Sequence, residues 1–107
     1  EIGSPNLQII LDPVNLLDIS NYQDQEAIVE EAIEVLGPDV AMVHLKDYMP
    51  MEGKLEAMAC GLGRMQYGTV LKFIKERKPC IHVTLENTTP ENNRQARDHI
   101  LELYRNV

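Results

Sequence analysis

Short apolar runs alternate along the chain with longer stretches in which apolar residues recur at helical spacing. The first run ends at Asp12-Pro13, which is typical of a strand that enters a loop, and the first helical stretch stops at Gly37-Pro38. A third helix takes its N-cap from Thr89 and its first turn from Pro90. The pattern predicts strands at 7–11, 40–45 and 80–85, followed by helices at 21–36, at 67–78 and after Thr89-Pro90, with a long loop at 46–66.

The helical spacing also predicts which side chains each helix buries. One apolar stripe per helix is expected to face the core, while the acidic residues of the first helix lie elsewhere on its surface. The predicted buried residues are Ile28, Ala32, Val35 and Leu36 in the first helix, Val70, Leu71, Phe73 and Ile74 in the second, and Ala96, Ile100, Leu101 and Tyr104 in the third.

Strands that alternate with helices of this length predict an α/β fold of βαβαβα order, with parallel strands and right-handed crossovers. Successive strand residues point to opposite faces, so each strand has an apolar face and a mixed face. The apolar sets are Leu7, Ile9 and Leu11, then Ala41, Val43 and Leu45, then Ile81, Val83 and Leu85; the mixed sets are Gln8, Ile10 and Asp12, then Met42 and His44, then Cys80, His82, Thr84 and Glu86. Mixed inner faces favour a closed barrel over an open sheet.

The mixed face of each strand ends in a side chain that can hold a metal, namely Asp12, His44 and Glu86. Parallel α/β proteins and barrels keep their chemistry at the carboxyl ends of the strands, where these three residues are expected to meet. Two carboxylates and an imidazole suit Mn²⁺, Mg²⁺, Co²⁺ or Zn²⁺. Each residue also has an ordinary structural explanation, as a turn cap, a packed histidine and an ion-pair partner respectively.

The composition and net charge limit the kinds of partner that the protein is expected to bind. The 107 residues are expected to form a single unit (1–107), and the net charge of -7 disfavours nucleic acid and anionic membranes. The longest apolar run is too short for a membrane span or a signal peptide. Cys60 and Cys80 lack the spacing of a metal or redox motif, which favours reduced thiols and a cytoplasmic location.

Four runs resemble the closing portion of the sugar phosphate isomerase/epimerase family, the xylose-isomerase-like barrels. The similarity extends over nearly the whole chain, and its most specific part is the His-Leu-Lys-Asp run followed by two glycines. The runs are Ile10-Leu11-Asp12-Pro13-Val14-Asn15, Val43-His44-Leu45-Lys46-Asp47, Gly61-Leu62-Gly63 with Tyr67 following, and Leu85-Glu86-Asn87.

This resemblance implies strands six, seven and eight of a (β/α)₈ TIM barrel, and a divalent metal held by Asp12, His44 and Glu86 together with a glutamate from a preceding strand. It also implies that Glu86 exchanges a proton with a sugar or sugar phosphate next to its carbonyl, through an enediolate. Asn15 stands where several epimerases of the family have histidine, and asparagine binds a hydroxyl but relays no proton. Lys46 and Asp47 lie beside the predicted site and are further candidates for binding substrate.

The chain begins at Glu1, and Gly3, Ser4 and Pro5 precede the first strand, which favours a piece cut from a longer protein. Three βα units leave one sheet face and both edges uncovered, so we expect either the missing N-terminal barrel units or self-association to cover them, and no activity from the chain alone. Two alternatives remain: a small non-enzymatic α/β binding or regulatory module, and, disfavoured by the acidic charge, a barrel DNA-repair endonuclease.

Overall fold

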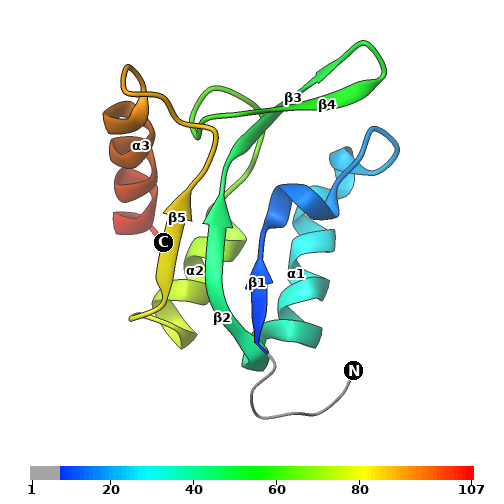
Figure 1. Cartoon of the computed structure of the whole chain (residues 1–107). Helices are drawn as coiled ribbons and strands as arrows, with labels where there is room; N and C mark the ends of the chain where they lie inside the picture. The colour runs from blue at the N-terminus through cyan, green and yellow to red at the C-terminus, as the bar shows by residue number, and fades with distance from the viewer. Residues whose placement is uncertain (1–7) are drawn as a thin grey trace.

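The computed structural model describes residues 8–107 and has a mixed α/β fold (Figure 1). Three parallel strands form a sheet in the order β1-β2-β5, and a helix follows each strand along the chain. The predicted order of strands and helices is therefore confirmed at this level. The elements are β1 (Ile9–Leu11), α1 (Gln25–Leu36), β2 (Val40–Leu45), β3 (Asp47–Met51), β4 (Lys54–Met58), α2 (Gly68–Arg77), β5 (His82–Leu85) and α3 (Asn93–Arg105), with short 3₁₀ turns at Pro13–Leu16, Tyr22–Asp24 and Gly37–Asp39.

The strand register brings the carboxyl ends of all three strands to one edge of the sheet. Leu11 of β1 pairs with Val43 of β2, and Leu45 of β2 pairs with Leu85 of β5. The backbone N–H of Glu86 then donates to the Leu45 carbonyl at 2.8 Å, which continues the pairing one residue beyond β5. The residues that directly follow β1 and β5 therefore flank the end of β2.

The core lies on the helix side of the sheet. Val43 and Leu45 are at most 1% exposed, and they belong to one continuous cluster of buried hydrophobic residues that includes Leu11 of β1. The predicted apolar strand faces are confirmed for these positions, whereas Ala41 is exposed. Leu7 lies outside the described residues, as do Gly3, Ser4 and Pro5.

The helices bury their predicted faces unequally. All four predicted residues of α2 are buried, as are Ala96 and Ile100 of α3, whereas Leu101 is exposed. The prediction for α1 is wrong by about one residue, because Val29 and Ile33 are its buried hydrophobics and Val35 is 68% exposed. The apolar stripe of α1 is broad, so its spacing fits more than one orientation, and packing against α2 selects this one.

The segment predicted as a long loop contains an antiparallel hairpin, β3–β4, paired from Asp47↔Met58 to Met51↔Lys54. Its two-residue turn is Glu52-Gly53, and both have positive φ angles, of 50° and 82°, as a tight hairpin turn requires. Glu-Gly is a weak turn signal compared with Asn-Gly, and Pro50 within β3 disfavours a strand, so the sequence did not predict the hairpin.

Figure 1 looks onto the face of the sheet that α1 and α2 leave open. Among the described elements, α3 lies beyond β5 and packs on α2, and the hairpin extends past the carboxyl ends of β1 and β2 (Figure 1). Ile10 on the open face is 56% exposed and His82 is exposed as well. The predicted open face is thus present in residues 8–107, and within that range no helix combines the length and apolarity of a membrane span.

Candidate metal centre

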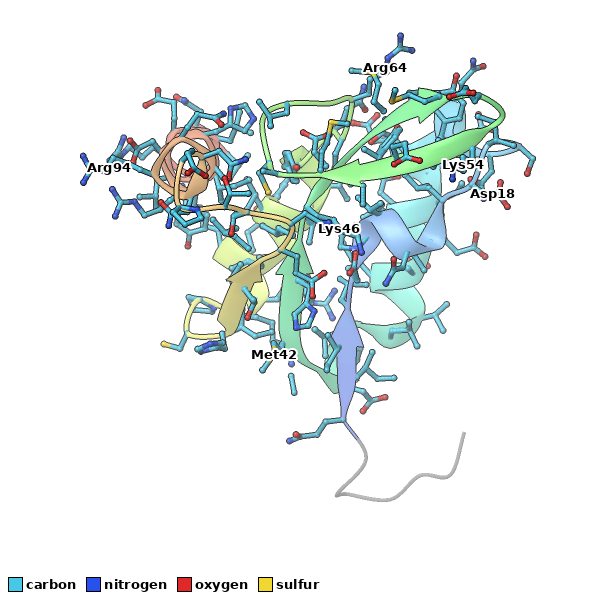
Figure 2. The ribbon with its side chains drawn as sticks, turned by 45° about the horizontal axis from the view of Figure 1, so that its top comes forward. Asp18, Met42, Lys46, Lys54, Arg64 and Arg94 are labelled. Carbon is cyan, nitrogen blue, oxygen red and sulfur yellow. The ribbon has the colours of Figure 1, made fainter. Side chains whose placement is uncertain are left out.

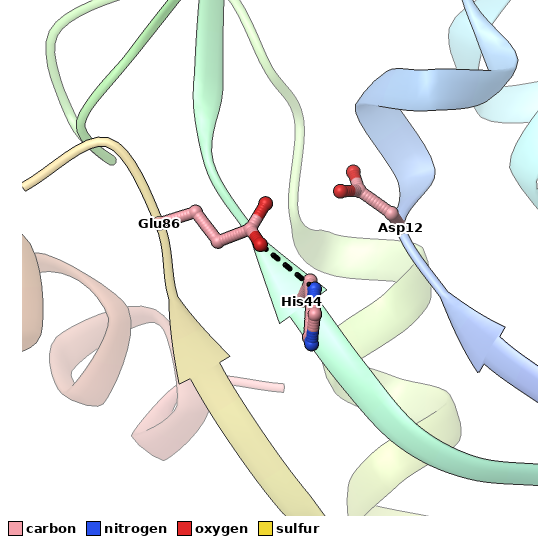
Figure 3. A group of neighbouring side chains, drawn as sticks. All are labelled: Asp12, His44 and Glu86. Atoms are coloured by element: carbon pink, nitrogen blue, oxygen red, sulfur yellow. Dashed lines mark ion pairs between the residues drawn. The ribbon is translucent and has the colours of Figure 1, made fainter.

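Asp12, His44 and Glu86 meet at the carboxyl end of the sheet, as their strand positions predict (Figure 3). Each offers one ligand atom, and these three atoms lie within 4.8 Å of one another. All three residues are partly buried. Asp12 follows β1, His44 is in β2 and Glu86 follows β5, so one ligand comes from each parallel strand.

Lys46 places a positive charge among these residues (Figure 2). Its Nζ lies 3.1 Å from Oδ2 of Asp12 and 3.6 Å from Oε1 of Glu86, and its side chain is only 13% exposed. The same ammonium donates to Oδ1 of Asn15 at 3.0 Å. Two of the three predicted substrate-binding residues, Asn15 and Lys46, therefore lie at the group that the strand ends form.

Both nitrogens of the His44 ring have a close neighbour. Nδ1 lies 2.8 Å from Oε2 of Glu86, and Nε2 lies 3.3 Å from the sulfur of Met42, two residues earlier on the same face of β2. The sequence did not identify these partners, although strand alternation already places Met42 beside His44. Donation from Nδ1 to the Glu86 carboxylate fixes the orientation of the imidazole.

The structure does not bring the third candidate, Asp47, to the group. Asp47 is 1% exposed, and its carboxylate accepts backbone N–H groups from Tyr48 at 2.9 Å, Gly61 at 2.9 Å and Met65 at 2.8 Å. Because successive strand residues point to opposite sides, Asp47 faces inward where Lys46 faces the open side. In this structure the Asp47 carboxylate holds the loop that joins β4 to α2.

Gly63 shows how closely that loop approaches β3. A Cβ atom at this position would lie 2.0 Å from the Tyr48 carbonyl oxygen and 2.6 Å from Oδ1 of Asp47, so only glycine fits. The backbone N–H of Arg64 donates to the same Tyr48 carbonyl at 2.9 Å. Gly63 therefore allows this loop to pack directly on β3.

Tyr67 supports the backbone at the end of β2. Its hydroxyl donates to the Lys46 carbonyl at 2.7 Å, and the residue is 2% exposed. Burial raises the pKa of Tyr67 well above its usual value, and the neighbouring Cys60 thiol and Asp47 carboxylate add to this effect. The phenol therefore stays protonated and continues to donate.

The chemistry of the donor set fits a divalent cation. Two carboxylate oxygens and one imidazole nitrogen are the ligands that Mn²⁺, Mg²⁺, Co²⁺ and Zn²⁺ accept, and three protein ligands leave a position open for substrate or water. Asp12 also has a structural role that needs no metal, because its Oδ1 accepts from the Asn15 N–H at 3.4 Å as the N-cap of a 3₁₀ turn. Asp12 caps that turn with one oxygen and faces Lys46 with the other.

The remaining histidines lie elsewhere. His82 is exposed near the start of β5, and His99 is on α3, where its ring packs edge-on against Tyr67 at 6.1 Å between centroids. Neither was predicted as a ligand. No protein-family model matches the chain, and neither the curated proteins nor the solved structures contain a significant match to it.

Proposed function

We propose that the chain is the C-terminal part of a divalent-metal-dependent sugar or sugar phosphate isomerase or epimerase. The observation that carries this proposal is the convergence of Asp12, His44 and Glu86, one from each of three adjacent parallel strands, with ligand atoms within 4.8 Å. The His44-Leu45-Lys46-Asp47 run and its resemblance to the sugar isomerase barrels direct the proposal to this class of enzyme.

The barrel itself is part of the proposal. Among the described strands, β1 and β5 each have one neighbour, so each has an outer edge that another strand can pair with. The exposed mixed face would become the lumen, and the metal group would stand at its carboxyl end, where barrel enzymes react. The mass of the native gene product tests this, because a complete barrel has about 250 residues.

The proposed reaction moves a proton at the carbon next to a sugar carbonyl. A bound divalent cation supplies positive charge for the oxygen that becomes negative in the enediolate. Glu86, whose side chain is 32% exposed on the open face, takes or returns the proton on one side of that carbon. Asn15 hydrogen-bonds a sugar hydroxyl through its amide. The base for the opposite side would come from another strand of the barrel, so this chain alone is expected to be inactive.

Metal titration tests the group directly. We expect the chain, freed of metal by a chelator, to bind Mn²⁺ in isothermal titration calorimetry, and Glu86→Gln to weaken that binding at least about tenfold. Glu102→Gln is the matched control, because Glu102 lies on α3 and pairs there with Arg105, away from the metal group. Unchanged Mn²⁺ affinity in Glu86→Gln would rule out the proposed ligand set.

One observation favours a different function, a small α/β binding or regulatory module without catalysis. The polar side chains of the group already pair among themselves, since Lys46 contacts both carboxylates and His44 contacts Glu86. In that case the group is a structural ion cluster. The same titration separates the two functions, because a structural cluster takes up no Mn²⁺ in the parent chain or in either glutamine variant.

A further inference from the structure

Lys46 holds a position that a cation bound to Asp12 and Glu86 would need. Its Nζ lies 3.1 Å from the first carboxylate and 3.6 Å from the second. Lys46 comes two residues after His44, so strand alternation places both side chains on the same face. Metal–oxygen and metal–nitrogen bonds in such sites are about 2.0–2.2 Å long. A metal within reach of all three ligands therefore lies next to the ammonium, and the two positive charges repel each other.

We infer that Lys46 is an internal counter-cation that is exchanged for the metal. Without metal, its ammonium neutralises Asp12 and Glu86 and keeps the two carboxylates close together. When metal enters, the ammonium leaves the carboxylates and remains at the site opening, available to the oxygen atoms of a substrate. This inference rests on the proposed metal site and adds a positioning role for Lys46 in assembling it.

Two features of the structure allow this exchange. The lysine stem is flexible, and the ammonium already has a third acceptor outside the ligand set, Oδ1 of Asn15 at 3.0 Å. Asn15 is exposed, so movement toward it takes Nζ out of the carboxylate pair and toward solvent. The backbone of Lys46 stays in place, because its carbonyl accepts from Tyr67 and the next residue, Asp47, is anchored in the loop.

Amine labelling measures the exchange without any enzyme assay. We expect Mn²⁺ to raise the acetylation rate of Lys46, read by mass spectrometry, because the ammonium loses two carboxylate partners. Lys54 is the internal reference, since it lies on the hairpin with a side chain 71% exposed and pairs only with Glu56 among the described ion pairs. Its rate is expected to stay constant as Mn²⁺ is added.

Substitution gives a second measurement. Lys46→Met keeps most of the stem and removes the charge, so Mn²⁺ affinity is expected to rise at least about fivefold, the effect of one unit charge about 4 Å away even in water. Lys54→Met is the matched control and is expected to leave the affinity unchanged. Thermal unfolding of the metal-free chain is expected to move the opposite way, with Lys46→Met less stable because the carboxylates then repel.

Each outcome decides between the claims. Mn²⁺ binding with a rise in Lys46 labelling supports the exchange. Mn²⁺ binding that appears only in Lys46→Met overturns it, because the ammonium then excludes the metal and does not give way to it. Mn²⁺ binding with unchanged labelling overturns the exchange and leaves the proposed metal site standing. Absence of Mn²⁺ binding in both the parent chain and Lys46→Met overturns the metal site and the exchange together.

Discussion

The buried Asp47 carboxylate is the polar centre of the loop that joins β4 to α2, and Asp47→Asn changes it with the least loss of volume. Oδ1 accepts two N–H groups, from Tyr48 and Met65, and Oδ2 accepts the third, from Gly61. An asparagine keeps one oxygen and turns an NH₂ group toward at least one of these donors. The N–H of Gly61 then loses its partner when the oxygen stays at Oδ1, and the other two N–H groups donate to a neutral oxygen in place of a charged one.

These losses set the expected magnitude. Losing one charged hydrogen bond at a buried site costs about 1.5–3 kcal/mol, and weakening two more adds to this. We therefore expect Asp47→Asn to lower the free energy of unfolding by about 2–4 kcal/mol, a large part of the 5–15 kcal/mol that is typical of a domain.

Urea unfolding followed by circular dichroism measures this loss, provided that the slope with urea is unchanged. Asp98→Asn is the control, because the Asp98 side chain is 61% exposed on α3 and pairs only with the adjacent Arg97 among the described ion pairs. Asp98→Asn is expected to change the free energy of unfolding by no more than about 0.5 kcal/mol. A loss below about 1 kcal/mol in Asp47→Asn would refute the role of Asp47 as the anchor of the loop.

Two further predictions concern the packing around this loop. Gly63→Ala is expected to destabilise the chain by at least about 2 kcal/mol, because its Cβ would meet the Tyr48 carbonyl. Gly68→Ala is the control and is expected to leave the stability unchanged, because no atom lies near its Cβ. Thermal melts of both variants check this. Burial raises the pKa of the Cys60 thiol while Cys80 is exposed, so a thiol reagent should react with one cysteine in the native chain and two in denaturant. Two fast-reacting native thiols would contradict the burial of Cys60.

The parts of the fold and site that the sequence predicts correctly follow from local periodicity. Alternation within each strand placed Asp12, His44 and Glu86 on one face, and parallel order brought their strand ends together. Neither step requires knowledge of the packing. The structure accordingly unites the three residues, and it places the candidate Lys46 in contact with both carboxylates.

The sequence does not predict the orientation of α1 or the β3–β4 hairpin. The apolar stripe of α1 is broad, so packing against α2 determines that Val29 and Ile33 turn inward and Val35 outward. The β3–β4 hairpin contains a proline and a weak Glu-Gly turn, and its strands pair mainly with each other. Local sequence gives little indication of the orientation of α1, because α2 is distant in the chain. It gives little indication of the hairpin because the proline and the Glu-Gly turn are poor signals for one.

Lys46 and Asp47 show how one strand end can serve the site and the scaffold together. They are neighbours in sequence, yet strand geometry sends the lysine to the open face and the aspartate into the core. The aspartate fixes the loop through three N–H groups, and Tyr67 from that same region holds the Lys46 carbonyl. The backbone at the lysine is therefore held by hydrogen bonds, whereas its four-carbon side chain can change its torsion angles. A side chain that must leave one set of acceptors for another requires this combination, because a mobile backbone would also displace His44, two residues earlier.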